Sequence, residues 1–291
     1  MRFSARIRTC RILFCVGCLL PTLLVSTVAI VLNTPAYHAS KLKRWQTSLS
    51  IQLGLVVELV QLDLNDQHQV VVYGITLHDP ESHALLARAR SATLTRTSAG
   101  LVIQLGQPEI ESQHLVRVTR ILHEHLLMRR SLAMAPFRLE SATLLLQDEP
   151  QSQSLLDLRM VLEVNRESTE VRVAFRPADM EASDEVHLRW VRNRQLDPPA
   201  TGWELHTGPD GLPCQLAYPW LPELESLGAT CRYAGSIWSE RQVAGWEAEL
   251  AGVVRQVDLD QLVTTHFPHK LSGMAELTLT RAIFHREQLA E

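Results

Sequence analysis

The sequence predicts a mainly β protein with few helices, in which an N-terminal transmembrane helix precedes a largely antiparallel sheet. One uncharged apolar run covers Ile12–Leu32, and many short segments after it alternate between apolar and polar residues. A period of two is typical of strands that bury one face and expose the other. Apolar residues make up 46% of the chain and charged residues 21%, which indicates a folded domain rather than a disordered tail.

The apolar run predicts a membrane anchor. As a helix, Ile12–Leu32 is long enough to span a hydrocarbon core of about 30 Å. More cations precede the run than follow it, namely Arg2, Arg6, Arg8 and Arg11 against Lys41, Lys43 and Arg44. The positive-inside rule therefore favours a cytoplasmic N-terminus. The predicted division is a cytoplasmic segment over residues 1–11, a transmembrane helix over 12–32 and an extracytoplasmic β-rich domain over 33–291.

A cleaved signal peptide is the alternative to an anchor. Small residues over Ala36–Ser40 offer a cleavage site. The apolar core of a signal peptide is usually only about 7 to 15 residues long, however, and this run is longer. Lipid attachment at Cys18 is disfavoured, because the apolar run continues after that residue. Both the anchor and the signal peptide carry the domain out of the cytoplasm.

A few segments have helical rather than strand spacing. Over Lys41–Leu53 apolar residues recur every three or four positions, and Gly54 stands where a helix stop is expected. The same spacing covers residues 113–130, where Ser112 is a candidate N-cap. A short helical turn is expected over Val257–Val263. These helices interrupt the sheet without changing the mainly β class.

Strand alternation is clearest between residues 156 and 190. The apolar residues predicted to share one face are Leu156, Leu158, Met160, Leu162, Val164, Val171, Val173, Phe175, Val186, Leu188 and Trp190. The polar residues predicted to share the other face include Asp157, Arg159, Arg172, His187, Arg189 and Arg192. Shorter alternating runs predict strands at 71–77, 92–95, 101–105, 203–205, 231–238, 246–252 and 271–279. Gly106 and Pro108 are expected to end the strand that begins at Leu101.

Charge and cysteine content narrow the classes of partner. The net charge is −4 and the pI about 6.3, so there is no basic footprint for nucleic acid. Five cysteines with this spacing form neither a disulfide scaffold nor a zinc motif. Cys214 and Cys231 are candidates for one disulfide in an oxidising compartment. The alternative is that they are two small buried side chains.

The sequence contains no motif that carries catalysis or holds a cofactor. It lacks a Gly-x-Ser-x-Gly elbow, a His-Glu-x-x-His pair, a phosphate loop and a dinucleotide fingerprint. His123 and His125 lie two residues apart, which puts them on different faces of a helix. His266 and His269 have a spacing that suits a metal, but no third ligand accompanies them. The expectation is a non-enzymatic protein without a cofactor or metal.

The order of features resembles the N-terminal part of AsmA-like and TamB-like proteins of Gram-negative bacteria, or a shortened member of that family. The features are the anchor, a short helix ending in Leu53-Gly54, and a strand pair closed by the segment Gly74–Pro80, whose sequence is GITLHDP. Further matching segments are Leu85–Leu94, Pro108–Glu111, Gly245–Gly252, Val257–Leu262 and Leu271–Leu277. The likeness covers most of residues 10–110 and 200–285 and is looser between them.

The resemblance implies a curved β-sheet groove with an apolar concave face. It also implies an inner-membrane anchor, a periplasmic domain and a role in envelope maintenance, outer-membrane assembly or phospholipid transport. The apolar residues of 156–190 are then candidate lipid contacts, and an open sheet edge is a candidate site for another envelope protein. Two alternatives stay open: an anchored structural or interaction module with a closed β core, and an extracytoplasmic enzyme whose site the sequence does not reveal.

Overall fold

The computed structural model describes residues 21–23, 25–27, 34–65, 69–98, 100–128, 136–148, 152–181, 184–242, 245–264, 272–285 and 288–289. The chain divides into two compact units, Met1–Ser48 and Leu49–Glu291. The predicted transmembrane segment lies outside the described residues except for helical stretches at 21–23 and 25–27. Among the residues that are described, no helix has the length and apolar content needed to cross a membrane.

Helix α3 (Pro35–Leu53) is longer than the predicted helix and begins six residues earlier than Lys41. Thr34 explains the earlier start, because the backbone N–H of Tyr37 donates both to its side-chain oxygen at 3.4 Å and to its carbonyl at 3.1 Å. The helix stops at Gly54, as predicted. That glycine has φ +70° and donates its N–H to the Ser50 carbonyl at 2.9 Å.

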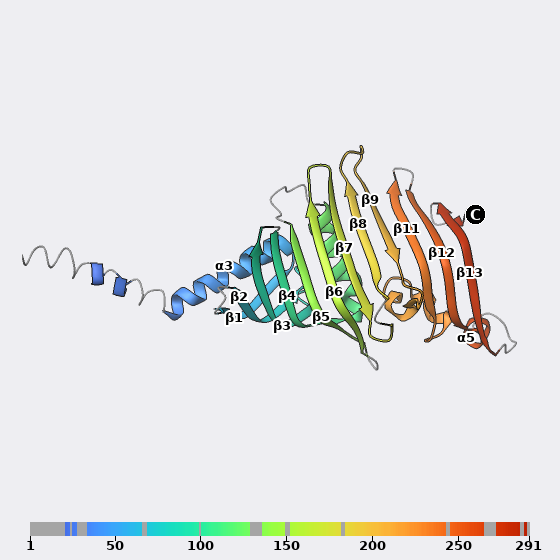
Figure 1. Cartoon of the computed structure of the whole chain (residues 1–291), viewed down its shortest axis with the longest axis horizontal. Helices are drawn as coiled ribbons and strands as arrows, with labels where there is room; N and C mark the ends of the chain where they lie inside the picture. Colours follow the sequence, from blue (N-terminus) through green and yellow to red (C-terminus); the bar gives the residue numbers. More distant parts are fainter. Residues whose placement is uncertain are drawn as a thin grey trace, which may run out of the picture. The chain divides into compact units, whose positions relative to one another are not determined.

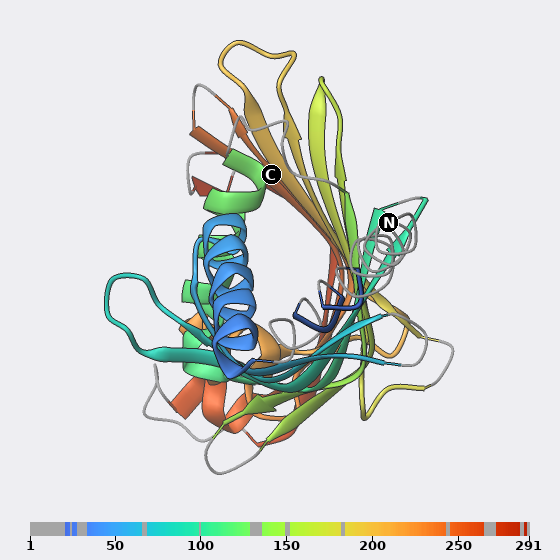
Figure 2. The ribbon, with the colours of Figure 1, turned by 90° about the vertical axis from the view of Figure 1, so that its left-hand side faces the viewer.

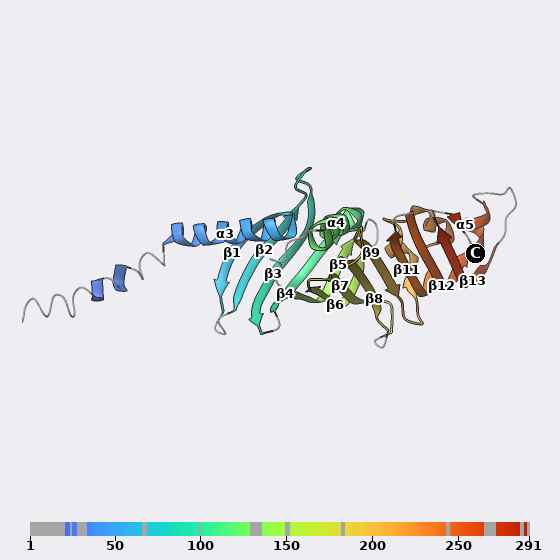
Figure 3. The same cartoon turned by 90° about the horizontal axis from the view of Figure 1, so that it is seen from above.

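The second unit is built on one open 14-stranded sheet, which confirms the mainly β, largely antiparallel prediction. The strands are β1 (Val56–Leu64), β2 (Val70–His78), β3 (Leu85–Thr97), β4 (Gly100–Glu111), β5 (Phe137–Gln147), β6 (Gln153–Val164), β7 (Ser168–Pro177), β8 (Val186–Asn193), β9 (Ala200–His206), β10 (Leu212–Pro213), β11 (Arg232–Gln242), β12 (Gly245–Asp258), β13 (Met274–His285) and β14 (Gln288–Leu289). They lie in chain order as a single layer, except that short β10 pairs beside β11 (Figures 1 and 3).

One strand pair departs from the antiparallel pattern. β4 and β5 are parallel, with Leu101 opposite Phe137 and Ile110 opposite Leu146. Between them run η2 (Ser112–His114), α4 (Leu115–Leu122) and the π-helical η3 (His123–Met128), which together match the helix predicted over 113–130. The helical crossover returns the chain to the end of the sheet at which β4 began. The next strand, β5, therefore runs parallel to β4.

The crossover defines two faces of the sheet, here called inner and outer. The inner face packs against α4 and η3: Leu126 and Leu127 of η3 bury Leu162 and Val171. Towards β1, Val118 and Ile121 of α4 pack with Leu55 and Leu86. Figure 2 shows α4, in green, on the side towards which the sheet curves. The opposite face, the outer face, carries the alternate residues of each strand, such as Val161 next to Leu162.

A line of irregular residues crosses neighbouring strands of the first half of the sheet. Gly74, Gln107 and Asp157 have φ values of +62°, +51° and +53°. Arg90 of β3 lies between Gly74 of β2 and Gln107 of β4 in the register, so these positions form one line across the strands. At Asp157 the register with β7 shifts by one residue, and such a bulge reverses which face the following residues take. The prediction that Gly106 and Pro108 end the strand at 101–105 is therefore wrong, because β4 bends at Gln107 and continues to Glu111.

The same bulge corrects one residue of the predicted apolar face. The register shifts between Leu156 and Arg159, at Asp157. Leu155, not Leu156, is consequently buried with Leu144 and packs beside Leu158 on the inner face. A simple alternation count misplaced Leu156 because it assumed an unbroken strand.

Short helical segments cover the inner face again near the C-terminal end of the sheet. They are η4 (Cys214–Ala217), η5 (Pro222–Leu227) and α5 (Leu259–Thr264), the last of which matches the turn predicted over 257–263. Leu216 of η4 packs against the buried residues Met180, Val186 and Leu212, together with Leu205.

Candidate binding face

The inner face carries almost all of the predicted lipid-contact residues, and the structure divides them by burial. Leu162, Val171 and Val186 are at most 2% exposed and form the core beneath helical segments. Around them, Met160, Val164, Val173 and Trp190 pack against the cluster that Leu162 and Val171 form with η3, and Leu158 and Phe175 pack against the cluster of Leu144, Leu146 and Leu155. In this conformation these residues contact protein, and their role towards lipid stays a prediction.

Beyond β8 the apolar rows continue across β9, β11, β12 and β13. One row runs from Trp190 to Trp203, Ser239, Ala248 and Phe284, and the next runs from Leu188 to Leu205, Ile237, Leu250 and Ala282. The buried clusters of the described residues do not include Trp203, Ile237, Leu250 or Phe284, which are all half-buried. These four residues, here called the open apolar patch, therefore present accessible apolar surface over β9, β11, β12 and β13.

A basic cluster borders the open apolar patch. It lies two residues further along the strands than the row of Trp190 and Trp203. Arg192 of β8 and Arg241 of β11 both stand opposite Thr201 of β9, and Arg192 donates to the Thr201 hydroxyl oxygen at 2.7 Å. Burial and the neighbouring charges of Arg194 and Arg241 lower the pKa of Arg192. Burial first, and then the positive charges of Arg192 and Arg241, lower the pKa of His123 on η3.

The structure corrects the predicted position of Arg192. The sequence prediction put it on the polar face with Arg189, but the register aligns Arg192 with Trp190 and Leu188 on the inner face. The two-residue period already contained this signal, since 188, 190 and 192 have the same parity. Arg241 lies far away in the sequence, and only strand pairing brings it to Arg192. Spacing alone does not reveal the cluster.

The outer face is polar and its charges are matched. Arg172 and Arg189 lie opposite each other and share Glu170, at 3.3 Å and 2.8 Å, and Arg189 also lies 3.7 Å from Glu204. The hydrogen bond from Arg189 holds the pKa of Glu170 below its usual value. A hollow of about 780 Å³ lies among these strands, with Val161 and Ala174 in its lining. Because the bordering arginines already have carboxylate partners, the hollow offers no free positive charge.

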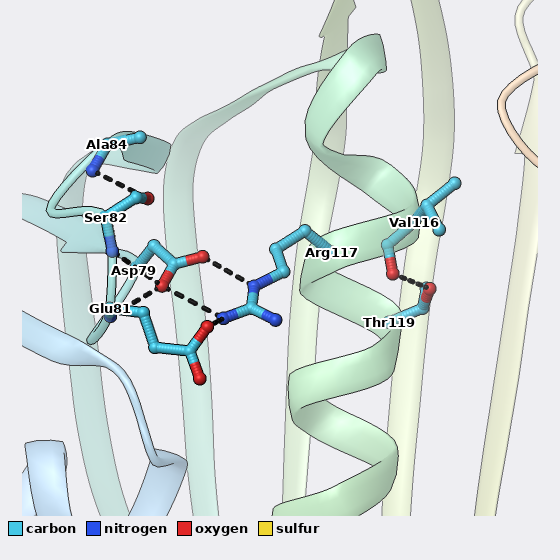
Figure 4. A network of polar contacts seen from close by, with 7 residues as sticks. All are labelled: Asp79, Glu81, Ser82, Ala84, Val116, Arg117 and Thr119. Carbon is cyan, nitrogen blue, oxygen red and sulfur yellow. Dashed lines mark hydrogen bonds and ion pairs between the residues drawn. The ribbon is translucent and has the colours of Figure 1, made fainter.

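A buried ion pair joins the β2–β3 hairpin to the crossover helix (Figure 4). Asp79 is 4% exposed and accepts two hydrogen bonds from Arg117, at 2.5 Å and 3.1 Å, and one from the backbone N–H of Glu81 at 2.7 Å. Arg117 also donates to Glu81 at 2.6 Å. These bonds, that of Arg117 first, hold the pKa of Asp79 far below its usual range. All partners are satisfied internally, which indicates a structural role.

The candidate disulfide residues come together beside β10. Cys214 and Cys231 continue the register in which Leu212 faces Tyr233 and Pro213 faces Arg232, and the N–H of Cys214 donates to the Cys231 carbonyl at 2.9 Å. Both are buried. Directly opposed residues of an antiparallel pair have Cα atoms about 4.5 to 5.5 Å apart, within the range that a disulfide spans.

The candidate metal residues do not assemble in the part of the chain that the structure describes. His123 and His125 lie on the π-helical η3, whereas His266 and His269 fall outside the described residues. Within the described ranges no group of three or more His, Cys, Asp or Glu side chains has an arrangement that suits a metal ion.

Comparisons with known proteins identify no relative: no family model, no curated protein and no solved structure matches this chain.

Proposed function

We propose that this chain is a membrane-anchored, non-enzymatic cell-envelope protein of AsmA-like type, whose apolar β-groove binds phospholipid acyl chains. In this proposal the segment 12–32 anchors the protein in the inner membrane with a cytoplasmic N-terminus, and the sheet lies in the periplasm. Its role is to assist phospholipid transport or outer-membrane assembly, with no cofactor.

The open apolar patch is the observation that supports acyl-chain binding. Trp203, Ile237, Leu250 and Phe284 lie on the inner face of β9, β11, β12 and β13, and none of the four belongs to a buried cluster of described residues. The backbone polar groups inside the sheet are paired along the ladders, so apolar side chains alone can line the surface. Each buried CH₂ of an acyl chain gains about 0.8 kcal/mol there.

The experiment measures lipid that co-purifies with the full chain. The protein is expressed in a Gram-negative bacterium, extracted in mild nonionic detergent and examined by native mass spectrometry with lipid extraction. Ile237→Asp places a charge on the patch, and Trp238→Asp places the same charge one residue away on the outer face. Circular dichroism verifies that both variants are folded.

We expect bound phospholipid on the unmodified protein and on Trp238→Asp, and loss of it on Ile237→Asp. An unmodified protein that carries no lipid contradicts the proposal. Equal lipid occupancy on the two variants contradicts the assignment to the inner face.

A second candidate is an anchored interaction module that binds a protein strand at the edge of the sheet. β13 pairs along its length with β12, while on its other side the described residues of β14 pair only with Phe284 and His285. Met274 and Leu277 on this strand are 63% and 45% exposed. An edge of this length is a template for an added strand. Cross-linking from Leu277→Cys to a co-purifying protein, without bound lipid, would favour this function.

A further inference from the structure

The basic cluster of Arg192, Arg194 and Arg241 lies at one end of the apolar rows on the inner face. β8 and β11 run in the same direction on either side of β9 (Figure 1). Arg192 and Arg241 therefore lie near the same end of these strands. Arg194 follows β8 and donates to the Leu127 carbonyl at 3.1 Å and to the Thr169 hydroxyl at 3.2 Å. These bonds tie Arg194 to η3 and to β7, and Arg192 is tied to β9 by its bond to Thr201.

Two members of this cluster have no carboxylate partner in the part of the chain that the structure describes. Arg172, Arg189 and other arginines of the outer face form ion pairs, whereas no described Asp or Glu lies within ion-pair distance of Arg192 or Arg241. Arg192 is half-buried and Arg241 is exposed, and both stand opposite Thr201, so two positive charges lie on one row of a partly dehydrated site. Partly buried charges normally acquire an opposite charge. An anion that bridges the guanidinium groups would supply it.

The spacing of the rows fits one end of a phospholipid. The arginine row, the row of Trp190 and Trp203, and the row of Leu188 and Ile237 follow each other at two-residue steps, which are about 6.6 to 6.8 Å along a strand. Guanidinium groups bind phosphate oxygens through paired, charge-assisted hydrogen bonds. A phosphate on the arginine row therefore directs the attached acyl chains onto the open apolar patch.

We propose that Arg192 and Arg241, supported by Arg194, form the headgroup subsite of the inner face and bind the phosphate of a phospholipid whose acyl chains lie on the open apolar patch. This inference rests on the proposed function, because it names the charged end of the same ligand. It assigns selectivity: the face takes phosphate-bearing lipids in preference to neutral lipids with the same chains.

The test titrates lipids into the full chain in dodecyl maltoside micelles. Phosphatidic acid and diacylglycerol with identical brominated acyl chains are compared, since bromine quenches tryptophan fluorescence at contact and Trp190 and Trp203 adjoin the subsite. Sodium phosphate serves as the competitor without acyl chains. The variant is the double substitution Arg192→Gln with Arg241→Gln. The control is Arg90→Gln, which changes an exposed arginine of β3 that donates to the Gln107 side-chain oxygen at 3.4 Å.

We expect the unmodified protein and Arg90→Gln to bind phosphatidic acid about tenfold or more tightly than diacylglycerol, as the loss of one charge-assisted hydrogen bond implies. The double variant is expected to bind the two lipids equally. Equal affinities in the unmodified protein, unchanged in the double variant, overturn the headgroup subsite while the acyl-binding proposal stands. Failure of both lipids to quench overturns both. If sodium phosphate competes as strongly as phosphatidic acid does, the subsite binds free phosphate rather than a lipid headgroup, and the proposal is overturned.

Discussion

At the scale of single residues, the buried contact between Asp79 and Arg117 fastens the β2–β3 hairpin to α4. Asp79→Asn removes the charge and leaves Arg117 with a neutral partner, so we expect the free energy of unfolding to fall by about 1 to 3 kcal/mol at pH 7. The control is Glu81→Gln, because the Glu81 side chain is 80% exposed and contacts the same arginine. Exposed pairs contribute at most about 1 kcal/mol.

The pH dependence of this pair has a defined sign. The folded pKa of Asp79 is depressed, mainly by Arg117, so its stabilisation is fully present above the ordinary carboxyl pKa of about 3.9. It is lost as the pH falls towards the lower folded pKa. Thermal unfolding of the full chain in detergent should therefore show the difference between Asp79 and Asp79→Asn shrinking below about pH 4. A difference that grows on acidification would contradict the assignment.

A disulfide between Cys214 and Cys231 is the second expectation at this scale. Their positions in register predict a bond if the domain folds in an oxidising compartment. Iodoacetamide labelling of the denatured, unreduced protein should modify Cys10, Cys15 and Cys18 and spare the pair. A bond closing this loop contributes about 3 kcal/mol, so reduction should lower the unfolding temperature. Labelling of both buried cysteines in protein freshly prepared from the envelope would show that they are free.

At the scale of elements, the junction between α3 and β1 depends on Gly54. A Cβ atom built there lies 2.1 Å from the His125 ring, and the backbone has φ +70°. We expect Gly54→Ala to destabilise the domain by about 2 kcal/mol or more, from overpacking added to a left-handed backbone. His125→Ala alone is the control, because it removes the ring and leaves the Gly54 backbone unchanged. Adding His125→Ala should recover part of the loss, and thermal unfolding measures all the variants. If Gly54→Ala costs the same with and without His125→Ala, steric contact with His125 is not the cause.

The elements show how far a period of two can be read from a sequence. A period of two predicted most strands, and a spacing of three or four predicted the helix at 113–130, because one face of each element is buried and leaves a repeating pattern. It misplaced Leu156 and ended β4 too early, because a residue with positive φ changes the phase without a fixed sequence signature. The basic cluster was missed for a different reason: Arg192 and Arg241 meet through strand pairing, which spacing along the chain does not encode.

At the scale of the whole second unit, a single-layer sheet gains its stability unevenly. Clusters at the crossover helix bury residues such as Leu162 and Val171, whereas the open apolar patch has no comparable cover among the described residues. A sheet with one face packed on helices and the other solvated matches the usual antiparallel arrangement. The uncovered part is what the lipid proposal uses, so stability and binding are expected to depend on different strands.

This separation predicts unequal costs for equal truncations. Val171→Ala removes two methyl groups from a side chain that is 2% exposed beneath η3 and should cost about 2 kcal/mol. Val161→Ala removes the same groups from the half-buried outer face of the neighbouring strand and should cost less than about 1 kcal/mol. Thermal unfolding of the full chain in detergent gives both values, and neither substitution should change lipid occupancy. Equal costs of the two substitutions would show that η3 does not cover β7 in solution. The division of the inner face into a packed part and an open part would then be wrong.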